Sequence, residues 1–190
     1  MKGNHLNNRH GSFSVPKNPW RLTRNLWFRK DSWTKIAAQH TEKRWKMPQA
    51  NDPIPLAAHE QDCPCGRGSP LRNCCLPRLS GEHPPRTAEQ LMRSRYTAHV
   101  FLQIDYLWQT WSSEQRQRSS PDQIRAWAAS CEWLGLQIIS TEAGQENDSE
   151  GLVSFVALYR HDGNFQQHHE VSLFHQVMGR WFYVDHRPAE

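Results

Sequence analysis

The 190-residue sequence lacks several patterns that would identify a common class of protein. It has no run of about 18 apolar residues, so we expect no membrane span. It contains no glycine-rich phosphate loop, no Ser-His-Asp order and no second metal cluster. Nothing near its start looks like a secretory signal, which predicts a cytoplasmic protein with reduced thiols.

Lysine is absent after Lys46, and this divides the chain by charge. Residues 1–46 hold 11 Lys and Arg against 2 acids, a net charge of +9, whereas the remainder carries −5. The basic segment has few aliphatic residues and carries four tryptophans, so we expect a disordered arm that could bind nucleic acid or a lipid surface. The alternative is that the natural start is Met47 and the preceding residues are an over-extended reading of the gene.

Four of the five cysteines, namely Cys63, Cys65, Cys74 and Cys75, lie within thirteen residues as C-x-C, eight residues, then C-C. Two thiolate pairs on either side of a turn with two glycines can surround one tetrahedral Zn²⁺. Four thiolates leave no position for water, so the ion would be structural and not catalytic. A disulfide pair or a cluster of buried thiols is the alternative. Because so small a unit has no core apart from its ion, we expect a chelator to melt it without unfolding the rest.

This segment resembles the SEC-C motif, C-x-C-x8-C-[CH], of the SecA translocase and many small bacterial proteins. Cys63, Cys65 and Cys74 match its three thiolates, and Cys75 stands where SecA has histidine. The resemblance implies zinc. It also implies a macromolecular partner, because the SecA element contacts the SecB chaperone and the ribosome.

The segments around the cysteines are rich in proline. Residues 47–62 read as an extended linker. Residues 63–79 contain the four cysteines and form the predicted zinc-binding unit, here called the knuckle. Residues 76–86 read as a connector with an ordered turn and no helix.

Helix signals begin directly after this connector. Thr87 and Gln90 form a capping-box pattern, and residues 88–111 have helical character with a break near Asp105, which we expect to cap a second segment. Residues 112–120 read as a polar loop. Ser120 then opens a helix that we expect to reach Leu134 and to end at Gly135, with Cys131 as a small core residue on its apolar stripe.

The period changes to that of strands after this helix. Residues 136–141, 152–160, 165–176 and 180–185 are rich in Val, Ile, Phe and Tyr and are separated by short turns. Short turns mean antiparallel neighbours, so the sequence predicts a four-strand meander. Helices first and strands afterwards indicate an α+β fold, a curved sheet with helices across one face.

The chain resembles the uncharacterised bacterial YchJ-like family over residues 61–187. The matching residues include Leu91 to Tyr96, Asp105 to Leu107, Trp133 to Leu136, Val153 to Ala157, His169-Glu170 and Trp181, Tyr183 and Asp185. The resemblance implies a SEC-C knuckle joined to a nuclear-transport-factor-two-like domain, a cystatin-like cone over residues 87–187. The chain departs from the family at Ser112, where many members have histidine, and at Glu190, where many continue into a second knuckle.

Candidate catalytic residues come from the predicted sheet and first helix. Glu170 or Asp185 could be an acid or base whose pKa is raised by burial, assisted by His169 or Tyr96. Against this, Arg93 and Arg95 could hold the two acids in ion pairs that lock helix to sheet, which we favour because no nucleophile–base spacing is visible.

Two functions follow from these residues. The first is a zinc-binding accessory or adaptor protein, whose knuckle docks on a protein, ribosome or nucleic-acid partner while the cone stabilises it or binds a ligand. The second is a small-molecule enzyme, for example a hydrolase, isomerase or dehydratase, that uses the cone pocket.

Overall fold

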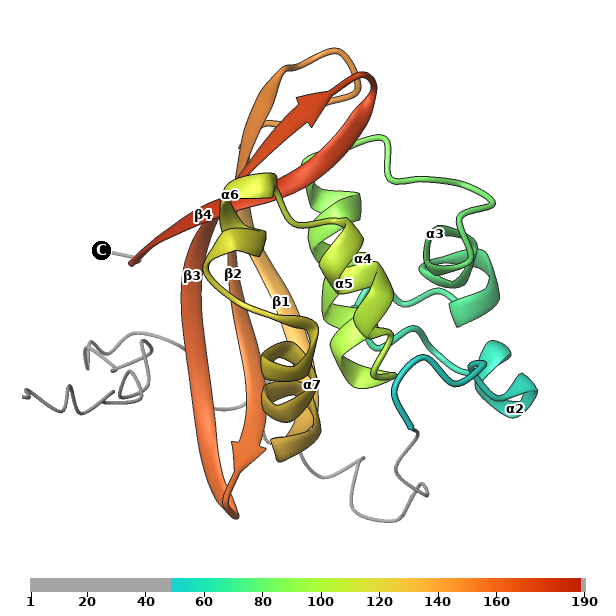
Figure 1. Ribbon diagram of the computed structural model, residues 1–190. Coiled ribbons are helices and arrows are strands. Elements are labelled where there is room, and N and C mark those ends of the chain that lie inside the picture. The colour runs from blue at the N-terminus through green and yellow to red at the C-terminus, as the bar shows by residue number, and fades with distance from the viewer. Residues whose placement is uncertain (1–48, 189–190) are drawn as a thin grey trace, which may run out of the picture.

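The structure is a computed structural model that describes residues 49–188. The predicted basic arm, residues 1–46, and the first two residues of the predicted linker lie outside this range. The described chain has the predicted α+β fold. Its helices precede a four-strand antiparallel sheet and pack on one face of it (Figure 1).

The segment before the cone is more ordered than its prolines suggested. It contains α2 (Leu56–His59), the 3-10 helix η1 (Leu71–Asn73) and α3 (Leu76–Leu79). The prediction that residues 76–86 contain no helix is therefore wrong for one turn. Pro77 suits the start of α3, where its missing amide has no helical partner to lose.

Helix α4 (Ala88–Val100) begins at the predicted cap, where Thr87 Oγ1 accepts the Gln90 amide at 3.2 Å. The Gln90 side chain reaches one residue further than a capping box requires and accepts the Arg86 amide at 3.0 Å. Helix α5 (Ile104–Gln109) starts without a side-chain cap of its own. The prediction that Asp105 caps it is wrong, because Asn51 Oδ1 accepts the Asp105 amide at 2.9 Å from outside the helix.

Two other helix boundaries differ from the sequence prediction. The predicted polar loop contains α6 (Ser113–Gln117), whose Gln115 amide is capped by Ser112 Oγ at 3.3 Å. Helix α7 (Pro121–Ser130) is capped by Ser120 as predicted but ends four residues before Leu134. Cys131 opens a strand directly and is buried there, while Gly135 lies at a register shift inside that strand. The expected helical stripe through Cys131 and Leu134 is therefore wrong.

The sheet is the predicted meander, in the order β1 (Cys131–Ala143), β2 (Glu150–His161), β3 (Asn164–Val177) and β4 (Arg180–Pro188). The β2–β3 and β3–β4 turns are Asp162-Gly163 and Met178-Gly179, and all four residues have positive φ. Such two-residue turns match the right-handed twist of the strands they join.

The main core joins the cysteine segment to the cone. Its buried residues include the four clustered cysteines, Leu71, Leu91, Met92, Tyr96, Leu136, Val153 and Phe174. Gly66 approaches β1 so closely that a Cβ atom there would lie 2.6 Å from the Leu136 carbonyl oxygen. The knuckle therefore packs against both α4 and β1.

The connection between α5 and α6 is bonded to β4. The Tyr183 amide donates to the Thr110 carbonyl at 2.9 Å, and the Ser112 amide donates to the Tyr183 carbonyl at 2.8 Å. These bonds place Trp111 against the sheet.

Candidate functional site

The first candidate site is the cysteine cluster. The Sγ atoms of all four residues lie within 4.8 Å of one another, with Cys65 to Cys74 at 3.5 Å and Cys74 to Cys75 at 3.9 Å. Sulfur ligands about 2.3 Å from a tetrahedral Zn²⁺ lie about 3.8 Å apart, so the cluster matches the size of such a site. A bonded disulfide has its sulfurs about 2.0 Å apart, and all four cysteines are free thiols here.

Backbone hydrogen bonds build the two cysteine pairs. The Cys63 amide donates to the Ser69 carbonyl at 2.9 Å, and the Gly66 amide donates to the Cys63 carbonyl at 3.2 Å. The positive φ of Gly66 and Gly68 allows this reversal. The Cys74 amide closes η1 by donating to the Leu71 carbonyl at 3.1 Å, which presents the second pair to the first.

The cluster is buried and polar contacts come to it from α4. Its four cysteines are at most 5% exposed. Arg93 donates to the Cys65 carbonyl at 2.7 Å and to Glu89 at 2.7 Å, while Thr97 Oγ1 lies 3.6 Å from Cys63 Sγ. The hydrogen bond between Cys63 and Cys65 lowers the pKa of Cys63 and raises that of Cys65. Four thiols this close cannot all ionise without a cation between them, so the donor set fits a thiophilic metal ion.

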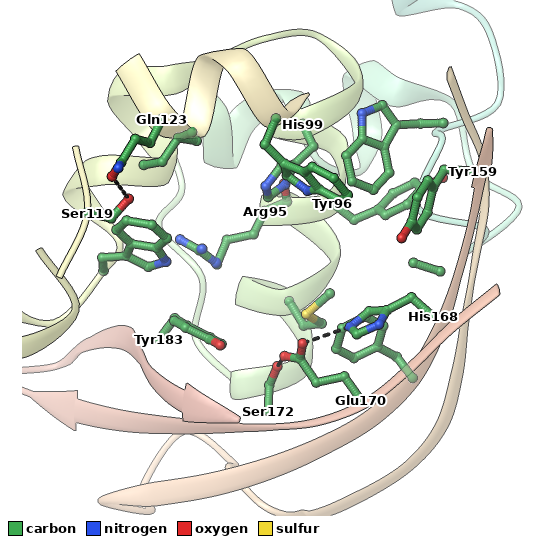
Figure 2. A pocket seen from close by; sticks show the side chains of 17 residues that line it. Arg95, Tyr96, His99, Ser119, Gln123, Tyr159, His168, Glu170, Ser172 and Tyr183 are labelled. Carbon is green, nitrogen blue, oxygen red and sulfur yellow. Dashed lines mark hydrogen bonds and ion pairs between the residues drawn. The ribbon is translucent and has the colours of Figure 1, made fainter. Parts of the chain in front are cut away.

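The second candidate site is a cavity of about 270 Å³ between the sheet and helices α4 and α7 (Figure 2), and Trp111 is one of the residues that line it. Its lining is mostly apolar, with a few polar side chains that converge on it. The lining includes Arg95, Tyr96, His99, Trp111, Trp133, Phe155, Ala157, Tyr159, His168, Glu170, Ser172 and Tyr183.

Glu170 lies on the β3 side of this cavity and is 5% exposed. Its carboxylate contacts His168 Nε2 at 2.9 Å and accepts a short hydrogen bond from the Ser172 hydroxyl. The three residues alternate along β3, so they share one face of the strand. The arrangement offers a carboxylate with two proton-bearing neighbours inside an apolar cavity.

Arg95 enters the same cavity from α4 (Figure 2). Its Nη1 donates to the Leu107 carbonyl at 2.9 Å and to Thr110 Oγ1 at 2.7 Å. The guanidinium carbon lies 5.0 Å from the ring centroid of Tyr183. Burial lowers the pKa of Arg95 to about 10, which leaves it charged at neutral pH. Burial also lowers the pKa of the neighbouring His99 to about 4, which keeps that imidazole neutral.

The structure brings together only some of the residues predicted from the sequence. Glu170 and Tyr96 both line the cavity, and Tyr96 is 3% exposed. Asp185 has a side chain that is 53% exposed, so the expected burial of this carboxylate is wrong. His169 lies on the opposite face of β3 from Glu170, with Nε2 3.1 Å from Ser154 Oγ. Strand alternation explains the separation of His169 from Glu170.

The predicted ion pairs between helix and sheet are wrong. Arg93 pairs with Glu89 on its own helix, and Arg95 is bonded to a carbonyl and a hydroxyl. Glu170 is instead paired with His168.

Sequence reasoning missed His168, Arg95, Trp111 and Tyr183 as members of the cavity. The alternation that groups Glu170 with Ser172 extends by one step to His168, so that residue could have been found. Trp111 reaches the cavity through the bonds between its segment and β4, which no local pattern signals.

Comparison with known proteins identifies the family of the cone domain. The family model described as the YchJ middle NTF2-like domain matches residues 87–186. The chain belongs to this family. Relatives of the YchJ-like chain include the UPF0225 protein of Geobacter sulfurreducens, 41% identical over 123 residues, or 65% of this chain and 76% of the relative. A UPF0225 protein of Haemophilus influenzae is 38% identical over 128 residues, covering 67% and 79% of the two chains.

Two solved structures of SEC-C motif containing proteins are similar to this YchJ-like chain. The solution structure from Rhodopseudomonas palustris has a TM-score of 0.63 and 33% identity, covering 68% of this chain and all of that one. The crystal structure from Psychrobacter arcticus has a TM-score of 0.57 and 27% identity, covering 68% and 84%. Both cover more of this chain than the matched cone accounts for. Within residues 49–188, no helix is long and apolar enough to cross a membrane.

Proposed function

We propose that this YchJ-family protein binds a small molecule in the cone cavity and that a structural Zn²⁺ on the four cysteines holds the knuckle to the cone. The observation that carries the first part is the cavity itself. About 270 Å³ of mostly apolar space receives a buried carboxylate from β3 and a buried guanidinium from α4. Concave, apolar sites with a few convergent polar groups are typical of ligand pockets.

The zinc proposal is supported by the four buried sulfurs at tetrahedral spacing and by the SEC-C motif of the two similar structures. Cys63, Cys65, Cys74 and Cys75 would hold the ion, which supplies a closed structural crosslink when bound. Reduced thiols at these positions fit a cytoplasmic protein, which we propose as its compartment.

Cavity filling tests the ligand-binding proposal. Ala157 lines the cavity from β2, so Ala157→Leu should occupy part of it, whereas Val156 points to the other face of the same strand. A library of metabolite-like compounds would be screened against the protein by saturation-transfer NMR. We expect hits that Ala157→Leu loses and the control Val156→Leu keeps. Hits that bind both variants equally, or a screen without hits, would overturn the proposal.

A docking role for the knuckle is a second candidate, which rests on the resemblance of residues 63–75 to the SecA element; the two similar structures also contain a SEC-C motif. The knuckle carries Arg67 and Arg72, whose side chains are 44% and 51% exposed and pair with Glu89 and Glu60, and Leu56 of the preceding segment is 81% exposed. Such a surface could contact a protein, a ribosome or nucleic acid. Affinity capture with mass spectrometry should recover a partner that Cys63→Ser/Cys65→Ser loses, and identical recoveries would exclude this role.

An enzyme is the third candidate, and the observation that favours it is Glu170. A buried carboxylate beside an imidazole and a hydroxyl is suited to moving a proton on a bound small molecule. Turnover of a cavity ligand that Glu170→Gln abolishes while binding persists would establish it. A ligand recovered unchanged after prolonged incubation would speak against it.

A further inference from the structure

We infer that the cone cavity takes a small organic monoanion with an aromatic or branched apolar body, whose carboxylate is held by Arg95 and the indole N–H of Trp111. The inference deepens the proposed small-molecule binding and rests on it. It names the class of ligand and the two side chains that recognise its charge.

The charge of Arg95 is buried without an ion-pair partner; Glu170, which lines the same cavity, acts on this charge from beyond ion-pair distance. The Arg95 side chain is 6% exposed and both of its hydrogen-bond acceptors are neutral, the Leu107 carbonyl and the Thr110 hydroxyl. Within the described part of the chain, no carboxylate oxygen lies within the 4.0 Å of an ion pair. A buried charge with neutral partners only is costly, and a carboxylate matches the planar donor fork of a guanidinium. A ligand carboxylate would therefore supply the hydrogen-bonded counter-charge that Arg95 lacks.

Trp111 provides an independent sign of a missing acceptor. Its Nε1 atom is buried and has no hydrogen-bond partner within residues 49–188. Its ring lines the cavity, with its centroid 5.9 Å from the Arg95 guanidinium carbon. A buried N–H without an acceptor costs about 1–3 kcal/mol, so such groups are rare unless a ligand or water completes them. Arg95, which has no ion-pair partner, and the Trp111 N–H, which has no acceptor among the described residues, thus lie close together in the cavity.

The acid in the cavity does not meet this need and limits the ligand's charge. Glu170 is engaged by His168 and Ser172 on its own strand. Its carboxylate would repel a second negative charge that reached the β3 side, which favours a monoanion over a dianion. His99 adds no positive charge, because burial lowers its pKa to about 4.

The remaining walls define the body of the ligand. Trp133, Phe155 and Tyr159 line the cavity, and the Trp133 and Tyr159 ring centroids lie 5.5 Å apart. Flat aromatic walls favour an aromatic or branched apolar group stacked against them. The ligand would therefore be amphiphilic, with its anionic end at Arg95 and Trp111.

The test uses the full chain loaded with zinc and matched pairs of probes. Phenylacetate, benzoate, cinnamate and 4-methylpentanoate would each be compared with its primary amide, which has nearly the same shape and no charge. Binding would be followed in ¹H–¹⁵N spectra through the indole N–H signal of Trp111, assigned with Trp111→Phe. We expect at least one acid to shift this signal and to bind about tenfold or more tightly than its amide.

Variants at Arg95 separate charge from packing. Arg95→Met should remove the preference for acid over amide, and Arg95→Lys should keep part of it because the charge remains without the fork. Trp111→Phe retains the aromatic surface and should weaken the binding of the acid but not that of its amide. If Arg95→Met does not fold, the Lys and Phe variants still decide the question.

The outcomes distinguish this inference from the proposed function. The monoanion inference is overturned if amides bind as tightly as their acids, or if the affinity for the acids is unchanged in both Arg95→Lys and Trp111→Phe. In either case the cavity remains a binding site. If no acid or amide binds at millimolar concentration and the library screen also yields no hits, both are overturned.

Discussion

Glu170 depends for its partners on its own strand and not on the helices. His168 and Ser172 stand two residues before and after it, and both side chains reach its carboxylate. Their spacing follows from the alternation of the strand, so the trio is preserved wherever β3 keeps its register. Asp185 differs in its exposure, because its side chain is 53% exposed, and its Oδ1 accepts the backbone amide of the next residue.

Substitution of these two acids should therefore have unequal effects on stability. Glu170→Ala leaves a buried hydroxyl and an imidazole without their acceptor, which should cost about 1–3 kcal/mol in the free energy of unfolding. Asp185→Asn should change it by less than about 0.5 kcal/mol, as is usual for an exposed site. Urea denaturation followed by circular dichroism measures both. Equal losses would contradict the burial that distinguishes the two residues.

At the scale of elements, the sequence predicted a helix or strand boundary correctly where a single local signal determined it. The side-chain caps at Thr87 and Ser120 and the glycines of the strand turns each correspond to an observed boundary. The prediction that α7 reaches Leu134 was wrong because Cys131 and Leu134 continue the helical spacing of Ile124 and Trp127. Pairing of β1 with β2 decides their conformation instead, and that competition is not visible in a single segment.

The candidate sites show the same division. The spacing of the cysteines was sufficient to group them, and strand alternation was sufficient to place Glu170 with Ser172. Arg95 and Trp111 meet only because α4, the α5–α6 connection and the sheet converge on one cavity. Contacts of that kind depend on tertiary packing, so no pattern along the chain predicts them.

The contact between knuckle and β1 can be tested with a matched pair of glycines. Gly66 and Gly68 both have a φ of 74°, so alanine at either position meets the same backbone strain. A Cβ atom at Gly66 would lie 2.6 Å from the Leu136 carbonyl oxygen, whereas at Gly68 nothing lies within 4 Å. We expect Gly66→Ala to destabilise the protein by about 1–3 kcal/mol more than Gly68→Ala in thermal unfolding. Equal losses would show that the knuckle does not pack on β1 in solution.

On the scale of the whole molecule, knuckle and cone share one core. The four clustered cysteines lie in the same group of buried residues as Leu91, Tyr96 and Phe174. Arg93 adds a polar link from α4 to the Cys65 carbonyl. The expectation that the knuckle would melt alone assumed a unit without such contacts. Loss of its fold would expose the α4 residues that it covers.

Removal of the metal should therefore weaken the cone as well as the knuckle. Purified protein is expected to contain about one zinc per chain, and a strong chelator should lower the free energy of unfolding of the cone by at least about 2 kcal/mol. Metal analysis and near-ultraviolet circular dichroism would follow the two events. Cys131→Ser is the control, since Cys131 lies outside the cluster and should leave zinc content unchanged. If the melting temperature of the cone is unchanged by the chelator, the shared core is contradicted.

The hydrogen bonds that join Thr110 and Ser112 to Tyr183 have a consequence for self-association. β4 is the last strand of the sheet, and an outer strand with free amides and carbonyls can recruit a strand from another chain. At Tyr183 the amide and the carbonyl are already bonded to the connection between α5 and α6, which runs beside β4 (Figure 1). A second chain could add to the middle of β4 only after that connection lifts away. The connection between α5 and α6, which contributes Trp111 to the cavity wall, thus also blocks the addition of a strand from another chain at this edge of the sheet.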